Sequence, residues 1–303
     1  MRLSHRRLNR TLLRRQHLLE RVDLEPHALA EHLVGLQAQE NLAPYLSMHA
    51  RLTSFDPHAV SRGLEDRSLV RLLAMRGTLH LLTADDALAL RPWTQATFER
   101  VLRTDPRPQF ERALVQTPPR GTWKGTGGVD YVPLEEWVGE PLREPDVPGT
   151  VRRYLRAFGP ATAGDLSVWA GVTRLRPLVL SMDDLVRHED ESGTVLFDVA
   201  DAPIEDEDAP APVRLLGTYD NVWLAHADRD RVTAPGVRRQ WLGANGGTAA
   251  TVFVDGWLTG LWRVVGGRVS IETMFRDLTP GEQEELDEEV QRVEALLARP
   301  AVG

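Results

Sequence analysis

The chain has 303 residues, of which 42% are hydrophobic and 26% are charged, and it contains no cysteine. This composition is typical of a globular protein and excludes a largely disordered chain, a collagen-like chain, disulfide bonds and thiolate metal sites. The length predicts about two domains, and no apolar run is long enough to span a membrane. Because a chain without cysteine fits a reducing compartment, we expect a cytoplasmic protein that is not embedded in a membrane.

The net charge of −8 is divided unevenly along the chain. Residues 1–124 hold 18 arginines and one lysine against 13 acidic residues, a net charge of +6. Residues 125–303 hold 17 arginines against 31 acidic residues, a net charge of −14. The flat guanidinium group matches phosphate geometry better than an ammonium group does. We therefore expect the N-terminal part to face a polyanion, although the protein as a whole is acidic.

Short helices followed by paired strands are predicted in the N-terminal part. Hydrophobic spacing predicts four helices, over 6–19, 26–36, 44–52 and from 57 onward. Two strands follow within 69–82, broken at Arg76-Gly77, and another helix begins at Ala84. This order of elements is typical of a winged helix-turn-helix. The polar face of the first helix carries four arginines, which are Arg7, Arg10, Arg14 and Arg15.

Two stretches rich in turn-forming residues follow. Residues 117–128 predict a loop or hairpin that exposes Trp123 to solvent. Residues 139–149 contain three prolines and two glycines and are predicted to be a linker.

The order of helices and strand recurs in the middle of the chain. Apolar spacing predicts three helices, over 151–158, 163–169 and 176–185, and then a strand over 194–199. Residues 200–213 are acidic and contain three prolines, which predicts a solvated connector. This segment therefore reads as a second winged-helix unit.

The C-terminal part is predicted to be β and then α. Three strands are expected, over 251–255, 258–265 and 268–274, with turns at Asp255-Gly256 and Gly266-Gly267. A last helix begins at Pro280 behind a Thr279 cap. The whole pattern predicts an α+β fold in three parts: a winged-helix region at 1–138, a second winged-helix unit with its connector at 139–213, and a β-rich unit with a terminal helix at 214–303.

Motifs for metals and nucleotides are missing from the sequence. The nine histidines are scattered, and His226 with Asp228 is one of the close His/Asp pairs. The simplest interpretation of that pair is an ordinary hydrogen-bonded loop. Gly125-Thr126-Gly127-Gly128 lacks the lysine and hydroxyl residue of a phosphate-binding loop. We therefore expect neither a metal nor a cofactor.

Gln37-Ala38-Gln39 stands out at the end of the second predicted helix. Two glutamines are common on any helix surface, so the pair alone does not indicate a function. Other segments of the chain support a functional interpretation. Gly35–Gln39, together with Arg71–Leu81 downstream, resembles the AlkZ-like winged-helix DNA glycosylases. Later segments agree with that family in the same order; they are 115–121, 156–162, 219–229 and 254–256.

The resemblance covers nearly the whole chain and implies both a fold and an activity. It implies tandem winged helices in a C-shaped clamp around duplex DNA, and excision of N7-alkylated purines, including bulky adducts and crosslinks. It also implies that Gln37 and Gln39 are the catalytic residues of a DNA repair enzyme. Between Trp93 and Val115 the chain is shorter than expected for the family, which would shorten the clamp.

Glutamine chemistry fits a substrate that is already activated. A glutamine side chain is not a useful base, but its carbonyl accepts and its amide group donates a hydrogen bond, so two glutamines can hold a water molecule. N7-alkylation gives the purine a positive charge, and the bond between C1′ and N9 then breaks without a general acid. The enzyme has mainly to position water and tolerate positive charge on the sugar. Glu40 could contribute electrostatically, although a solvated helix residue is the simpler interpretation.

DNA contacts are expected from basic side chains that bind phosphate without reading sequence. The resemblance places the loop containing Arg229 and Arg231 near DNA. These two arginines have acidic neighbours, so internal ion pairs compete with DNA for them, and Arg229 is the favoured one. Arg10 and Arg14 are further candidates, with a solvated helix face as the competing interpretation, and Lys124 in its turn is another. The partner is then duplex DNA with alkylated purines.

Two other classes of protein compete with the glycosylase. One is a non-catalytic winged-helix DNA-binding protein, such as a regulator, because winged helices serve both roles. A regulator usually carries a dimerisation helix, and here the single apolar stripe of the terminal helix is expected to pack internally. We therefore favour a monomeric enzyme. The other, a ligand-binding protein, has no motif in its favour.

Overall fold

The computed structural model describes residues 1–103, 107–233 and 249–301. Its first four helices are α1 (His5–Arg15), α2 (Pro26–His32), α3 (Ala43–Arg51) and α4 (Pro57–Glu65). Each was predicted, but α2 ends earlier than expected. Val34 and Gly35 have φ angles of +52° and +91°, which turn the chain out of the helix and into the short strand β1 (Leu36–Gln37). The expectation that the glutamine motif ends a helix is therefore wrong.

An antiparallel sheet receives β1 at one edge. Its strand order is β1-β3-β2-β4-β5. The central pair is the predicted hairpin, β2 (Leu69–Leu73) and β3 (Leu79–Thr83), joined by the turn Met75–Gly77. The other edge is formed by β4 (Leu114–Gln116) and β5 (Tyr131–Pro133).

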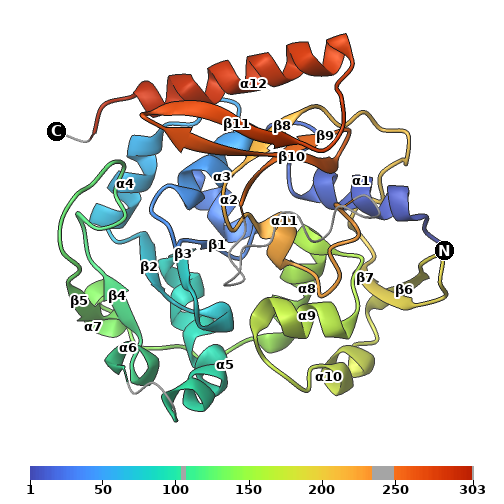
Figure 1. Ribbon diagram of the computed structural model, residues 1–303. Coiled ribbons are helices and arrows are strands. Elements are labelled where there is room, and N and C mark those ends of the chain that lie inside the picture. Colours follow the sequence, from blue (N-terminus) through green and yellow to red (C-terminus); the bar gives the residue numbers. More distant parts are fainter. Residues whose placement is uncertain (104–106, 234–248, 302–303) are drawn as a thin grey trace.

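Helices α5 (Ala84–Leu102), α6 (Pro108–Glu111) and α7 (Leu134–Val138) gather beside this sheet (Figure 1). The loop between β4 and β5 contains Trp123, which is buried with only 1% of its surface exposed. The predicted exposed tryptophan is wrong because the indole packs against Tyr45 and its nitrogen donates to the Arg299 carbonyl. This loop is anchored by the C-terminal end of the chain, a contact that local sequence does not show.

The middle of the chain forms three helices and a hairpin. The helices are α8 (Val147–Phe158), α9 (Ala163–Ala170) and α10 (Arg176–Ser181). The hairpin pairs β6 (Leu185–Glu189) with β7 (Val195–Val199). Helix α8 begins inside the predicted linker, and the predicted third helix ends at Ser181, before β6 begins at Leu185.

The C-terminal part is a four-stranded sheet covered by one long helix. The strand order is β11-β10-β9-β8. The strands are β8 (Arg214–Leu216), β9 (Ala250–Val254), β10 (Trp257–Val265) and β11 (Arg268–Met274). The short helix α11 (Asn221–Leu224) follows β8. Helix α12 (Pro280–Ala298) lies across the sheet (Figure 1), and its Thr279/Glu282 capping box confirms the predicted start.

The three parts of the chain share their hydrophobic core. One cluster joins Leu12 and Val70 from the first part with Tyr154 from the second and Phe253 from the third. The predicted boundaries fall where α7 ends at Val138 and just before β8 begins at Arg214. Within the described ranges, no helix combines the length and the apolar character needed to cross a membrane.

Candidate catalytic site

Gln37 is the last residue of β1 and lies opposite His80 of β3. Its side chain is buried, with 5% of its surface exposed, and its Oε1 accepts a hydrogen bond from Arg76 Nη2 at 3.0 Å. The next residue continues the ladder, because Ala38 N donates to the Leu79 carbonyl at 2.7 Å. Gln37 is therefore held both by the sheet and by a guanidinium group.

Gln39 lies just beyond the ladder and is exposed. Its Oε1 accepts from the Leu79 backbone N–H at 3.4 Å, a long hydrogen bond. Both glutamine side chains thus contact the segment from the Met75–Gly77 turn into β3. The structure brings the two predicted catalytic residues to one edge of the sheet.

Two arginines hold the glutamine segment from within the protein. Arg76 contacts the Gln37 side chain, and Arg71 Nη2 donates to the Ala38 carbonyl at 2.6 Å. Burial lowers the pKa of Arg71 to about 10, with help from the nearby Arg120 charge. Burial also lowers the pKa of Arg76 to about 10, and the Arg229 charge acts in the same direction. Both side chains remain charged at neutral pH.

His80 completes the surroundings of Gln37. Its Nδ1 is 2.9 Å from the Thr78 carbonyl and its Nε2 is 3.2 Å from Arg76 Nη2. A carbonyl only accepts and a guanidinium only donates, so Nδ1 carries the proton and Nε2 is the acceptor. Burial, and then the Arg76 charge, lower the pKa of His80 to about 3. The imidazole is therefore neutral at physiological pH.

Glu40 is exposed beside the motif and accepts from Thr218 Oγ1 at 2.9 Å. The same loop braces the motif from behind, because Asn221 Nδ2 donates to the Gly35 carbonyl at 2.9 Å. Asp220, between them, forms a fully buried ion pair with Arg51 at 2.8 Å. The 218–221 segment thus holds the backbone just before β1, at Gly35, and the Glu40 side chain just after it.

The arginine face predicted for the first helix is wrong at Arg10 and Arg15. Arg10 is fully buried, donates to the Ala209 carbonyl at 2.8 Å and pairs with Asp255. Arg15 pairs with the buried Asp198 at 2.8 Å. The structure therefore places Arg10 out of reach of DNA. Arg14 alone among these three is exposed, with Glu20 and Glu205 at 3.5 and 3.7 Å.

Lys124 also has an internal role that the sequence did not predict. Its Nζ donates to the carbonyls of Leu297 and Arg299 at 2.6 and 2.8 Å, at the C-terminal end of α12. Carbonyls at a helix end lack helical partners, and a nearby lysine can satisfy them. This geometry opposes the predicted phosphate contact.

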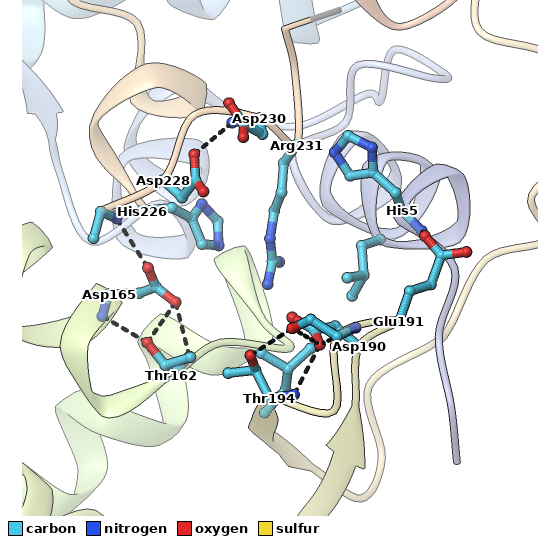
Figure 2. Close-up of a pocket in the computed structure, with 14 residues that line it drawn as sticks. His5, Thr162, Asp165, Asp190, Glu191, Thr194, His226, Asp228, Asp230 and Arg231 are labelled. Atoms are coloured by element: carbon cyan, nitrogen blue, oxygen red, sulfur yellow. Dashed lines mark hydrogen bonds between the residues drawn. The ribbon is translucent and has the colours of Figure 1, made fainter. Parts of the chain in front are cut away.

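The side chains of Arg229 and Arg231 lie in two different environments. Arg229 is half-buried, donates to the Ala227 carbonyl at 2.9 Å and lies close enough to Arg76 to affect its pKa. Arg231 extends into a cavity of about 520 Å³ formed by this loop, α9 and the β6–β7 turn (Figure 2). Burial lowers the pKa of Arg231. Of the two, Arg229 is the one associated with the glutamine site.

Acidic side chains outnumber basic ones around the cavity that holds Arg231. Asp165, Asp190 and Asp228 line it, together with the buried His226 (Figure 2). His226 Nε2 is 3.1 Å from the Phe158 carbonyl, and burial lowers the pKa of His226 to about 3. In the parts of the chain described by the structure, no group of three His, Asp or Glu side chains is placed to hold a metal. Negative lining disfavours phosphate, which separates this cavity from a DNA-binding surface.

Arg76 and His80 were not predicted as site residues. Both belong to the segment Arg71–Leu81, whose resemblance to the family gives no role to either side chain. The break at Arg76-Gly77 was the available signal, because a turn between two buried strands can present a side chain. The partner of that side chain depends on β1, whose pairing was not predicted.

Comparison with known proteins identifies the family to which the chain belongs. The model of the family described as DNA glycosylase AlkZ-like matches residues 30–109 and 107–296. The chain is 27% identical over 343 aligned residues to a Streptomyces sahachiroi protein named interstrand DNA cross-link repair glycosylase, covering 91% of this chain and 92% of the relative. These matches place the chain among the DNA glycosylases, enzymes that act on N-glycosyl bonds.

A solved structure agrees with the fold. The chain superposes on Streptomyces sahachiroi DNA glycosylase AlkZ with a TM-score of 0.76 and 22% identity, covering 97% of this chain and 98% of that one. The protein belongs to the AlkZ-like family, as its sequence motifs predicted.

Proposed function

We propose that the protein is a monofunctional DNA glycosylase that hydrolyses the N-glycosidic bond of N7-alkylated purines in duplex DNA, including bulky adducts and crosslinks. The observation that carries this proposal is the placement of Gln37 and Gln39 against one segment, from the Met75–Gly77 turn into β3, at the sheet edge of an AlkZ-like protein. The relative named for interstrand DNA cross-link repair supports damaged DNA as the substrate.

The site needs no general acid, because the alkylated purine is already positively charged and is a good leaving group. Water oxygen bonds to C1′ while the C1′–N9 electron pair leaves with the purine and neutralises its positive charge. The proton lost by the attacking water passes to solvent. Gln37 and Gln39 hold that water, so they contribute by position and by hydrogen bonding rather than as bases. The contact between Glu40 and Thr218 supports a minor role for this carboxylate.

We propose that DNA lies along a clamp made by winged-helix units at 1–138 and 139–213 and by the β-rich part at 214–303. The two family-model matches meet at residues 107–109, inside the segment in which this chain is expected to be short. A shortened clamp would leave more of the duplex uncovered. The enzyme acts as a monomer in the cytoplasm, with Arg14 and Arg229 as its best-placed phosphate contacts.

Release of an alkylated base is the direct test. A duplex with one N7-methylguanine is incubated with the protein, and hot alkali then cleaves the strand at each abasic site formed. A second duplex carries a bulky N7 adduct, because lesion size is part of the proposal. Strand cleavage with either substrate supports the glycosylase. Tight binding of both duplexes without base release would identify a non-catalytic DNA-binding protein.

Alanine at either glutamine should slow base release and spare DNA affinity. Each lost water contact costs on the order of 1–3 kcal/mol, so Gln37→Ala or Gln39→Ala should slow single-turnover release roughly 10- to 100-fold. The double variant should lose less than the sum, because both residues act on one water. Glu40→Gln is the matched control and should stay near the wild-type rate. A double variant that releases base at the wild-type rate would refute the mechanism.

A further inference from the structure

The contact between Arg76 and Gln37 determines which end of the glutamine amide faces the substrate. Arg76 Nη2 lies 3.0 Å from the Gln37 side chain. A guanidinium group has five donors and no acceptor, so the atom facing it has to be the carbonyl oxygen. The Gln37 Nε2 group then points away from Arg76. Within the described residues, Nε2 has no hydrogen-bond partner, and it is not among the buried unpaired atoms.

We propose that Arg76 is a positioning residue that locks the Gln37 amide with its NH₂ donor toward the reacting water, leaving Gln39 to supply the acceptor. The inference rests on the proposed function, in which both glutamines hold that water. In this arrangement Gln37 donates to the water oxygen and the Gln39 carbonyl accepts a water proton. The long 3.4 Å contact with Leu79 N leaves the Gln39 carbonyl free to take this stronger bond.

Arg76 is itself held in place from three sides. Its Nη1 donates to the Trp169 carbonyl at the end of α9, and its Nη2 is shared with the His80 acceptor. Its backbone lies in the left-handed region, with a φ of +56°. A Cβ atom at Gly171 would lie 2.8 Å from the Arg76 backbone, so the α9 end packs directly on the turn. A side chain fixed in this way can hold another side chain in one orientation.

Arg76 carries a buried charge, so its position depends on the hydrogen bonds and the packing around it. None of the described carboxylates forms an ion pair with Arg76, and Arg229 lies near enough to repel it. Hydrogen bonds to a charged donor are stronger than neutral ones, so the Gln37 carbonyl compensates part of the missing anion. A carboxylate in this position would neutralise Arg76, but it would offer the water no donor.

Substitutions at both partners separate this role from a general structural one. Arg76→Met removes the donors and should slow single-turnover release of N7-methylguanine about 10-fold or more, with DNA affinity changed less than about 3-fold. In the Gln37→Ala background, Arg76→Met should add no further loss, because its effect passes through Gln37. Arg76→Lys should recover part of the rate. Equal slowing by Arg76→Met in both backgrounds would overturn the proposal.

Gln37→Glu tests the direction of the hydrogen bond. Its carboxylate has only acceptors and would pair with Arg76, so its rate should fall as far as that of Gln37→Ala. A rate equal to or above wild type would mean that the water needs an acceptor at residue 37, and the proposal would be wrong. Arg91→Met is the matched control, because Arg91 is a buried arginine that bonds Gln95 and backbone carbonyls and does not touch the motif. It should keep the wild-type rate.

A spectroscopic measurement keeps the lock testable if no base is released. The ¹⁵N-glutamine side-chain amide signal of Gln37 is assigned by its loss in Gln37→Ala. In the wild-type protein this signal should be shifted from the free-glutamine position and rigid on the nanosecond timescale. In Arg76→Met it should become mobile, and in Arg91→Met it should not change. A mobile wild-type signal would refute the lock, whereas a rigid signal in a protein without activity would refute only the proposed function.

Discussion

Several arginines of this protein are structural residues rather than candidates for binding DNA. Arg10, Arg15 and Arg51 are each buried beside an aspartate, in contacts that join segments 169 to 245 residues apart. Burying a charge is costly unless it is paired, and these carboxylates provide the pairing. Helical periodicity places Arg10 and Arg14 on the same helix. It cannot show that Arg10 forms an ion pair with Asp255 and that Arg14 does not.

Arg14 and Lys124 should respond differently to substitution. Arg14→Ala should weaken binding to duplex DNA and reduce the salt slope of log K by about one, because one phosphate contact is lost. Lys124→Met should leave affinity and salt slope unchanged. It should instead lower the free energy of unfolding by about 1 kcal/mol, because two carbonyls at the end of α12 lose a donor. Titrations at two salt concentrations and urea unfolding measure both effects. A loss of DNA affinity in Lys124→Met would restore its predicted role.

The long elements were predictable from the sequence, whereas the short ones that build the site were not. Helix α12 and the β2–β3 hairpin carry their own patterns, with a capping box in one and two apolar runs around a turn in the other. Strand β1 has only two residues and exists because β3 offers an open edge. Gln37 and Gln39 were therefore found through resemblance to a family, while Arg76, which depends on that pairing, was missed.

The end of α9 should matter to the site more than an equivalent helix end elsewhere. Gly171 and Gly139 both follow a helix with positive φ, at +73° and +85°, but only Gly171 lies against the Arg76 backbone. Alanine at either position should cost about 1 kcal/mol of unfolding free energy from the left-handed backbone. Gly171→Ala should also displace Arg76 and slow base release, whereas Gly139→Ala should keep the wild-type rate. Equal rates in the two variants would contradict this role of α9.

The whole molecule should be sensitive to acid because it buries neutral histidines. His80 and His226 are 1% and 3% exposed, and each has its pKa lowered to about 3. Between that value and about 6.5, the unfolded chain binds protons that the folded protein does not, so stability falls as pH decreases through this window. Each residue contributes up to about 1.4 kcal/mol per pH unit.

Urea unfolding at pH 7 and pH 5 should therefore show the lower stability at pH 5, with about 2–4 kcal/mol of the difference coming from His80 and His226. His17 and His49 should add to the difference, because burial lowers their pKa values to about 4 and about 3. His226→Gln should reduce this difference, because one imidazole that burial keeps neutral is removed. His27→Gln, which replaces an exposed histidine, is the matched control. Equal stability at the two pH values would show that burial does not keep these histidines neutral.

The position of α1 has a consequence for the synthesis of the protein. Asn9 donates to the Gly256 carbonyl and Arg6 pairs with Asp255, so the first helix made is completed by residues near the end of the chain. At about 5–20 residues per second, α1 leaves the ribosome on the order of 10–50 s before these partners. During that time its leucines and its unpaired arginines are open to chaperones and to other nascent chains. The β9–β10 hairpin thus completes the surroundings of α1, and a chain cut before Asp255 would leave Arg6 and Asn9 without these partners.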